Sequence, residues 1–390
     1  MPLTLIFLCA PAFLVTAAGL LAALVFLSRL RLPKVTRHGV LTLILPLTGE
    51  AAGLGALLRA IAAQTLQPRR LLICLESTQD PAYLRARQLA RKSQLPIEIL
   101  IAGAATQSAQ KCSNQIAGLE RIDAEDEVVV LFDADILPPS WWLSALASPV
   151  LDGSADIVTG YRWPMVVGAQ RLGAHLTLAI DRGIALLPRP AVFNVTWGGS
   201  LALSPQVIAK LDLARLLSET LSDDCAIGEQ AGLLGLRVLT RRALLVPTPA
   251  TLSLASAWLF GRRQYQIIRI YRPQIWWLAF LTLSVRLTAW SILLVNIDQW
   301  WARFAVGLLA GVALTVAAVQ ALVGRYLGSA DTLGVTLLQL VLALLKPLVD
   351  LFHWSLVLGA WNARIVRWGH LSYRVFEPGQ VAVTGRRRWH

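Results

Sequence analysis

The sequence is poor in charge, and this scarcity is the first constraint on what the protein can be. Only 15% of its 390 residues are Asp, Glu, Lys or Arg, while 56% are hydrophobic, and the mean hydropathy is +0.58. Soluble globular domains carry about 25% charged residues and about 45–50% apolar ones. The low charge therefore excludes a disordered chain, a coiled coil and an ordinary soluble enzyme, and the apolar surplus predicts contact with lipid.

Cysteine is scarce as well, and the common nucleotide-binding loops are missing. The four cysteines have neither C-x-x-C nor zinc-ligand spacing, which excludes a disulfide framework and a metal finger. The histidines have no partner at metal-ligand spacing, so we interpret them as structural or solvated; they include His175, His353, His370 and His390. The sequence has no G-x-G-x-x-G and no G-x-x-x-x-G-K-[ST], which disfavours dinucleotide-binding and P-loop proteins.

Acidic residues are outnumbered by basic ones, 23 to 36, which gives a net charge of +13. Such a balance fits nucleic acid, anionic lipid or a phosphorylated substrate. The basic residues lie beside apolar segments and are not interleaved along a recognition helix. Lipid headgroups therefore explain them more simply, and we expect no nucleic-acid partner.

The chain begins with an uncharged apolar stretch, residues 2–28, which is long enough to cross a bilayer. Four basic residues follow it: Arg29, Arg31, Lys34 and Arg37. By the positive-inside rule this end is cytoplasmic and the N-terminus faces outward. We predict a transmembrane anchor over residues 1–30.

A second apolar region, residues 275–363, predicts further membrane helices. Residues 304–324 carry no charge, and 275–296 are apolar apart from Arg286. Residues 332–363 are interrupted by Lys346, Pro347 and Asp350, and would form one kinked helix, two short helices or a re-entrant pair. The basic tail, residues 364–390, indicates a cytoplasmic end, whereas three simple spans would place it outside. A re-entrant pair resolves this conflict.

The middle of the chain, residues 38–250, alternates apolar strand patterns with helical ones. Strands are expected over 39–47, 69–77, 97–103 and 127–135, and helices over 50–64 and 80–93. This alternation predicts an α/β domain with a parallel sheet, in which ligands bind at the carboxyl ends of the strands. Acidic side chains occupy these ends and are expected to face one crevice: Glu76, Asp80, Asp133 and Asp135.

Asp133 and Asp135 directly follow the apolar run VVVLF. Strand alternation places both on one side of the chain, about 7 Å apart. Two such carboxylates suit a hard divalent cation that keeps positions free for phosphate oxygens. We predict a Mg²⁺ or Mn²⁺ site here, against the alternative of a solvated pair of turn acids.

Two further patterns lie downstream. Asp223 and Asp224 begin a helical pattern, where a carboxylate would both favour the helix and serve as a general base. Gln266 and Arg269 are three residues apart in an expected interfacial segment, residues 251–274, and share one helix face. That segment is either a basic membrane-surface helix or a place where the guanidinium meets a diphosphate.

In this order the motifs resemble the D, D-x-D, (E/D)D and (Q/R)xxRW series of membrane-bound family 2 type glycosyltransferases. More narrowly, the sequence is similar to the ceramide glucosyltransferase group, including bacterial ceramide- and hopanoid-associated members. Three further segments carry the resemblance: ICLESTQDPA (73–82), SAQKCSNQIAGLE (108–120) and RIVRWGHLSYRV (364–375). The last motif has Ile270 where the family has Trp.

The resemblance implies an α/β GT-A nucleotide-diphospho-sugar transferase domain, with one N-terminal and three to four C-terminal transmembrane or re-entrant helices. It implies metal-dependent, inverting transfer of a glucose-like sugar from a UDP-sugar to a membrane lipid such as ceramide, at the cytoplasmic face of the bacterial inner membrane. The implied roles are uridine contact for Glu76, Asp80 and Lys111, ribose or metal contact for Asp133, metal ligation for Asp135, catalytic base for Asp224, and diphosphate contact for Gln266 and Arg269.

Other functions stay open at this point. The acceptor would be ceramide, a hopanoid or another lipid alcohol. A processive polysaccharide synthase is disfavoured because it needs more membrane spans and because Ile270 replaces the motif tryptophan. A membrane transporter or scaffold would leave the acids at the strand ends unexplained.

Overall fold

The computed structural model describes residues 2–33, 38–168, 171–190, 193–362 and 364–389, so Lys34, Arg37 and His390 lie outside the described residues. The chain divides into two compact units. The helical unit comprises Met1–Leu30, Trp163–Pro188 and Pro249–Ala363. The sheet unit comprises Arg31–Arg162, Arg189–Thr248 and Arg364–His390.

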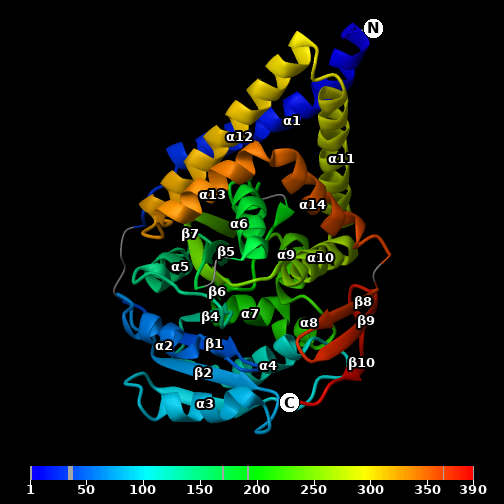
Figure 1. The fold of residues 1–390 in the computed structure, drawn as a ribbon. Coiled ribbons are helices and arrows are strands. Elements are labelled where there is room, and N and C mark those ends of the chain that lie inside the picture. Colours follow the sequence, from blue (N-terminus) through cyan, green and yellow to red (C-terminus); the bar gives the residue numbers. More distant parts are fainter. Residues whose placement is uncertain (1, 34–37, 169–170, 191–192, 363, 390) are drawn as a thin grey trace. The chain divides into compact units, whose positions relative to one another are not determined.

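The sheet unit is built on a seven-stranded sheet of order β3-β2-β1-β4-β6-β5-β7 (Figure 1). Strands β3, β2, β1 and β4 are parallel, whereas β6 runs antiparallel to both β4 and β5. The α/β class and its parallel strands are therefore confirmed. The strands are β1 (Leu41–Pro46), β2 (Arg70–Leu75), β3 (Ile97–Ile101), β4 (Val128–Phe132), β5 (Ile157–Val166), β6 (Ser200–Leu203) and β7 (Val238–Ala250).

The pattern of hydrophobic residues explains why these strands and helices form. All five residues of β4 are buried, as expected of a central parallel strand covered on both faces. Helix α2 (Leu54–Ala62) buries Leu54, Leu57, Leu58 and Ile61, the spacing of one helix face. The remaining helices of this unit are α3 (Pro81–Ala90), α4 (Gln110–Leu119), α5 (Trp142–Leu151), α7 (Pro205–Leu211), α8 (Leu213–Ser218) and α9 (Asp223–Leu233).

Among its described residues, the helical unit contains three helices long and apolar enough to cross a membrane: α1 (Pro2–Ser28), α11 (Pro273–Val295) and α12 (Trp300–Tyr326). Helices α13 (Leu333–Leu344) and α14 (Lys346–Leu358) follow, bent by 85° at the break between them. The interruption expected at Lys346 and Pro347 is therefore present. Helices α13 and α14 form either a broken span or a re-entrant loop. The other two helices are α6 (Leu172–Ala185) and α10 (Leu254–Tyr271).

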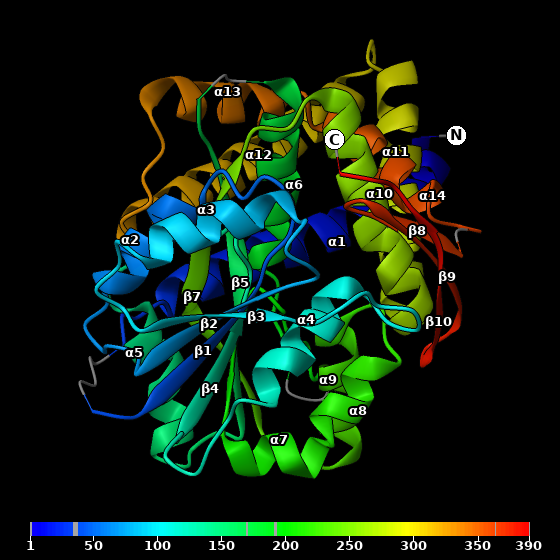
Figure 2. The ribbon, with the colours of Figure 1, turned by 90° about the horizontal axis from the view of Figure 1, so that it is seen from below.

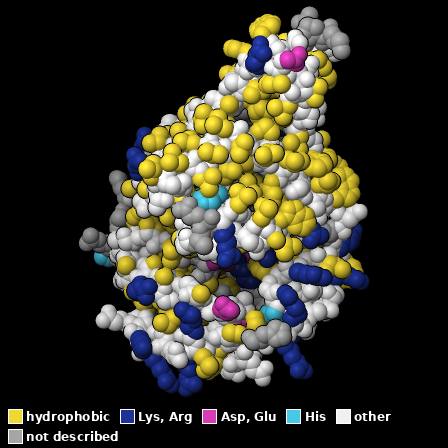
Figure 3. All heavy atoms as spheres, viewed as in Figure 1, with side chains coloured by type: hydrophobic (Ala, Val, Ile, Leu, Met, Phe, Trp, Pro, Cys, Tyr) yellow, Lys and Arg dark blue, Asp and Glu magenta, His cyan; other side chains and the backbone are white. Residues whose placement is uncertain are grey.

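The surface of the helical unit suits a bilayer. Figure 3 shows hydrophobic side chains gathered over its long helices, where Trp300, Phe304 and Leu278 are largely exposed. The charges that interrupt the apolar segments are paired, because Asp350 lies 2.7 Å from both Arg286 and Lys346. Pairing within the protein is how intramembrane charges are tolerated.

The C-terminal segment, predicted only as a basic tail, forms a three-stranded antiparallel sheet within the sheet unit. Its strands are β8 (Ile365–Trp368), β9 (Leu371–Glu377) and β10 (Gln380–Arg386). The views in Figures 1 and 2 show this small sheet near α4. There the Val383 amide donates to the Thr106 carbonyl at 2.9 Å, and the Gln110 amide donates to the Tyr373 hydroxyl at 3.1 Å.

Candidate active site

Lys111, on the first turn of α4, is the centre of a buried charge cluster in the sheet unit. Its ammonium lies 2.7 Å from Asp133 Oδ1 and 2.9 Å from Asp223 Oδ2, and donates to the Gly198 carbonyl at 3.3 Å. Burial lowers the pKa of Lys111, but the charges of Asp133, Asp223 and Asp224 raise it by more, to well above its usual range. The lysine therefore stays protonated. Its contacts connect the turn after β4, the N-terminus of α9 and the backbone at Gly198.

Asp224 stands at the N-terminus of α9, as the sequence predicts. Its carboxylate accepts hydrogen bonds from the Cys225 amide at 2.7 Å, the Gly198 amide at 3.3 Å and the Ser222 hydroxyl. Burial and the charge of Asp223 raise the pKa of Asp224, against the lowering effect of Lys111 and these hydrogen bonds. A carboxylate held in place with a raised pKa has the properties of a general base.

Gly198 lies directly beside the Lys111–Asp223 ion pair. A Cβ at this position would lie 2.7 Å from both the Lys111 ammonium and an Asp223 carboxylate oxygen. The missing side chain therefore makes room for the Lys111–Asp223 ion pair. The Gly198 carbonyl accepts a hydrogen bond from Lys111, and the Gly198 amide donates one to Asp224. Gln115 adds a further hydrogen bond to Asp223 at 2.8 Å.

Asp133 and Asp135 both follow the end of β4, on the turn where the sequence places them. The Asp133 side chain is 30% exposed and pairs with Lys111. The Asp135 side chain is exposed to solvent although many protein atoms surround it. That crowding, together with the charge of Asp133, raises the pKa of Asp135 to about 6.

These two carboxylates fit a divalent cation. The cluster of Asp133, Asp135, Asp223 and Asp224 contains four carboxyl groups beside the single ammonium of Lys111, so it can accept a further cation. In the part of the chain that the structure describes, no three His, Cys, Asp or Glu side chains gather into a metal-binding group. A Mg²⁺ or Mn²⁺ ion held by Asp133 and Asp135 would therefore complete its shell with phosphate oxygens and water.

Glu76, expected to contact uridine, is buried at the end of β2 and held by the C-terminal sheet. His370 Nε2 lies 2.8 Å from Glu76 Oε2, and the Arg386 guanidinium pairs with Oε1. Arg386 also donates to the Ala105 carbonyl at 3.1 Å, and the Trp389 ring lies 3.9 Å from the His370 ring. Sequence reasoning missed His370 and Arg386 as partners of this acid.

Asp80 caps α3 and closes the turn after β1. Its carboxylate accepts hydrogen bonds, all at 2.9 Å, from the Ala82 amide, the Gly49 amide and the Thr48 hydroxyl. Burial raises the pKa of Asp80, and these three donors oppose that shift. The side chain thus connects the ends of β1 and β2, and its contact with a nucleotide remains a prediction.

Gln266 and Arg269 lie on α10 in the helical unit, one helical turn apart as predicted. The Arg269 guanidinium stacks over Trp276 at 5.1 Å and over Trp277 at 6.0 Å. Its buried Nε has no hydrogen-bond partner among the described residues. A stacked guanidinium with an unused N–H is suited to an anionic ligand.

Arg386→Met gives a test of the C-terminal contact. It removes the guanidinium that pairs with Glu76. Under the expectation that Glu76 contacts the uridine of a UDP-sugar, the KM for that donor should rise about tenfold while kcat changes little, because the charge-assisted hydrogen bond that holds Glu76 is lost. Initial rates at varied donor concentration measure this split. Arg388→Met, on the same segment but at an arginine that does not pair with Glu76, is the control. A fall in kcat with unchanged donor KM would contradict the assignment.

A family model described as Glycosyl transferase family 21 matches residues 4–381, nearly the whole chain. No curated protein matches the chain.

Among solved structures, the chain is similar to the mannosyltransferase PcManGT from Pyrobaculum calidifontis in complex with GDP-Man and Mn²⁺. The identity is 15%, the match covers 90% of this chain and 97% of that one, and the TM-score is 0.46. It is also similar to glucosyl-3-phosphoglycerate synthase from Mycobacterium tuberculosis in complex with Mn²⁺ and UDP-glucose. There the identity is 14%, the coverage is 59% and 78%, and the TM-score is 0.36.

Proposed function

The chain belongs to glycosyl transferase family 21 and is a glycosyltransferase that uses a nucleotide sugar, and from this premise we propose that it transfers glucose or a similar sugar from a UDP-sugar to the hydroxyl of a membrane lipid such as ceramide. The observation that carries the proposal is the cluster around Lys111, in which a candidate base and two candidate metal ligands lie side by side. The GT-A-like α/β fold and the apolar helices agree with it.

In this proposal Asp224 takes the proton from the acceptor hydroxyl as the oxygen attacks the anomeric carbon. The α9 N-terminus and the donors around Asp224 hold the carboxylate in one orientation. Direct displacement needs one base and a stabilised leaving group, and it inverts the anomeric configuration. A retaining enzyme with a covalent intermediate would require a second carboxylate as nucleophile.

The leaving diphosphate requires positive charge. Gln266 and Arg269 would bind its oxygens, with the guanidinium offering paired N–H groups in a fixed plane. A divalent ion at Asp133 and Asp135 would supply electrostatic stabilisation of the same charge when bound. Lys111 fixes the positions of Asp133 and Asp223 through its two ion pairs. Glu76 and Asp80 would form the uridine end of the site.

The raised pKa of Asp224 predicts a pH dependence. Because burial and Asp223 raise this pKa, the carboxylate takes up a proton at a higher pH than a free aspartate, whose pKa is about 3.9. Activity should therefore fall on the acid side as the base becomes protonated, with a midpoint above that value. Lys111→Met should move this limb of the kcat profile to higher pH, because it removes a charge that lowers the pKa. An unmoved limb would contradict the role of Asp224.

Metal removal gives a separate prediction. EDTA treatment of the purified protein should reduce sugar transfer to background, and Mn²⁺ or Mg²⁺ should restore it, because the diphosphate charge would otherwise lack its counter-ion. In Asp135→Asn the metal concentration for half-maximal activity should rise. Full activity after EDTA, confirmed by metal analysis of the sample, would exclude the metal-dependent mechanism.

We also propose that the protein is embedded in the bacterial inner membrane with its sheet unit in the cytoplasm. The C-terminal sheet contacts Glu76, so both lie on the same side of the membrane. An even number of crossings must then separate them. Crossings by α11 and α12 alone satisfy this count, which supports a re-entrant arrangement of α13 and α14.

The products of the purified protein with radiolabelled UDP-glucose and ceramide test the proposal. We expect one lipid-soluble monoglycoside. Hopanoid and other lipid alcohols, offered in parallel, identify the preferred acceptor. Labelled polymer would instead show a processive polysaccharide synthase, and no labelled lipid with any acceptor would overturn the proposal.

A further inference from the structure

The Trp276 indole forms the surface on which the Arg269 guanidinium lies. The Trp276 side chain is fully buried, and the guanidinium carbon of Arg269 lies 5.1 Å from its ring centroid. The Trp276 Nε1 donates to the Val357 carbonyl at 3.2 Å, which fixes the plane of the ring. The Phe280 ring stacks nearly parallel to it, with the centroids 5.4 Å apart. A guanidinium that lies on a ring fixed in this way has its own orientation restricted.

The second half of the bent helix pair α13 and α14 contacts Trp276 directly. Val357 belongs to α14, and Trp361 lies in the turn that follows this helix. The Trp361 ring meets Trp276 and Trp277 edge-on, at a centroid distance of 5.3 Å from each. These residues therefore touch both of the tryptophans over which the Arg269 guanidinium lies.

Helix α14 also binds the face of α10 that carries Arg269. Four residues follow one another on this face at spacings of four, three and four positions. The first three hydrogen-bond to α14 or to the residue after it, and the fourth, Arg269, contacts Trp276. The three hydrogen bonds join Trp258 Nε1 to Ser355 Oγ at 3.2 Å, Arg262 Nε to the Gly359 carbonyl at 2.7 Å, and the Tyr265 hydroxyl to His353 Nε2.

The aromatic contact orients Arg269 and leaves it able to bind an anion. A cation–π contact restrains a guanidinium without an acceptor oxygen, so it does not use up the N–H groups. The buried Nε of Arg269 indeed has no hydrogen-bond partner in the described part of the chain. The residue after Arg269 is Ile270, so the aromatic surface comes from α11 and not from the motif that carries the arginine.

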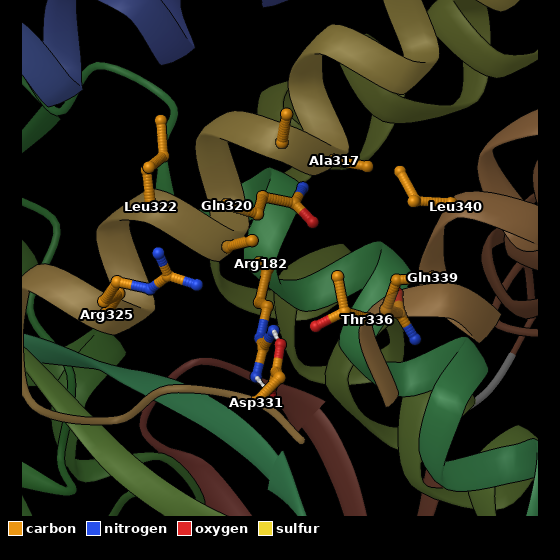
Figure 4. A pocket seen from close by; sticks show the side chains of 11 residues that line it. Arg182, Ala317, Gln320, Leu322, Arg325, Asp331, Thr336, Gln339 and Leu340 are labelled. Carbon is orange, nitrogen blue, oxygen red and sulfur yellow. Dashed lines mark hydrogen bonds and ion pairs between the residues drawn. The ribbon is translucent and has the colours of Figure 1, made fainter. Parts of the chain in front are cut away.

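A cavity of about 290 Å³ in the helical unit is separate from this contact (Figure 4). Residues of α6, α12 and α13 line it, and Figure 4 shows Arg182 paired there with Asp331. None of the described residues that line the cavity belongs to α10, α11 or α14. A substitution at Trp276 therefore changes the surroundings of Arg269 and leaves the lining of this cavity as it is.

We propose that Trp276 is a positioning residue for Arg269, and that Val357 and Trp361 keep Trp276 in place. The inference rests on the proposed function, because Arg269 binds the diphosphate of the donor there. It gives the second half of the bent pair a role in the reaction: α14 orients the arginine that meets the leaving group.

Binding of UDP and of UMP to the purified full-length protein in detergent with Mn²⁺, measured by calorimetry, tests this proposal. Trp276→Leu removes the ring and should weaken UDP binding about tenfold, as should Arg269→Lys. Binding of UMP, which lacks the second phosphate, should change less than about twofold. Trp276→Phe retains an aromatic face and should bind UDP within about threefold of the wild type.

Trp290→Leu is the matched control. Trp290 is a buried tryptophan on the same helix, α11, and it clusters with Ala12 of α1 and Ala302 of α12. Its loss should lower the thermal unfolding midpoint about as much as Trp276→Leu does, because both create a cavity in a packed core, but it should leave UDP binding unchanged. Equal weakening of UDP binding in both variants would show a general structural effect and would overturn the proposal.

A double-mutant cycle separates positioning from an independent role of Trp276. In the Arg269→Lys background, Trp276→Leu should weaken UDP binding little further, because the contact is already lost. Two full, additive losses would overturn the proposal. Trp361→Leu tests the same contact at a side chain that is 41% exposed, so its effect on folding is smaller. We expect about threefold weaker UDP binding from it, and unchanged binding would contradict the role of Trp361.

The proposed function fails by a different result. A wild-type protein that shows these effects on UDP binding, but transfers no sugar to any lipid, would contradict the transfer reaction and leave the role of Trp276 intact. Wild-type binding of UDP that is no tighter than that of UMP would overturn the role of Trp276, because Arg269 would then make no diphosphate contact.

Discussion

Asp224→Asn is expected to lower kcat by about 10²–10⁴-fold, the range that a positioned general base contributes. The amide keeps the size of the side chain, but it cannot accept the proton of the acceptor hydroxyl. Sugar transfer to lipid, measured from labelled UDP-sugar at saturating donor and acceptor, gives the effect. Binding of UDP should change little, because Asp224 is assigned to the acceptor and not to the nucleotide.

Glu229→Gln provides the matched control for this substitution. Glu229 is an exposed acid on the same helix, α9, so its loss changes the net charge in the same way without touching the cluster. We expect wild-type rates from it. Full transfer activity in Asp224→Asn would show that Asp224 is not the catalytic base. An equal loss of activity in both variants would show that the effect comes from the change in net charge and not from the loss of a base.

Arg269→Lys is expected to lower kcat by about 10²–10³-fold, the cost of losing one preorganised donor to a developing charge. The substitution retains the positive charge but loses the planar fork and its stacking on Trp276 and Trp277. Single-turnover rates with bound donor measure the effect on the chemical step.

Arg263→Lys is the control for Arg269. It lies on the same helix, where its guanidinium stacks over Phe260, and its expected role is at the membrane surface. It should keep most of the activity. If Arg269→Lys retained the wild-type rate while Arg263→Lys lost it, the diphosphate contact would be assigned to Arg263 instead of Arg269.

The sequence predicts the sheet well because local pattern and burial agree there. The apolar run VVVLF becomes the fully buried β4, and Asp133 follows it at the expected strand end. The spacing of Leu54, Leu57, Leu58 and Ile61 likewise predicts α2. In such elements each residue's preference points to the same structure.

Long-range contacts are where the sequence falls short. Nothing local connects Glu76 with His370 and Arg386, which follow it by 294 and 310 residues. The C-terminal strands carry a usable signal, since Leu371, Tyr373 and Val375 alternate and are buried. The arginines among and around these residues make the alternation hard to recognise. The sequence therefore predicts a basic tail where the structure has a packed sheet.

Gly198 shows the same limit at shorter range. The space that its missing side chain leaves holds the Lys111–Asp223 ion pair. Which atoms occupy the room beside a glycine depends on packing from α4 and α9, and no spacing along the chain encodes it. The pairing of Asp350 with Arg286 arises in the same way.

Lipid mass spectrometry of bacterial cells that express the wild-type chain or Asp224→Asn tests the central claim most directly. We predict a new lipid in the wild-type extract, heavier than a host or supplied lipid alcohol by one hexose and absent from the Asp224→Asn extract. Nuclear magnetic resonance of the purified product should show the inverted anomeric configuration. Extracts without any changed glycolipid, although the wild-type protein is folded and membrane-bound, would contradict the claim.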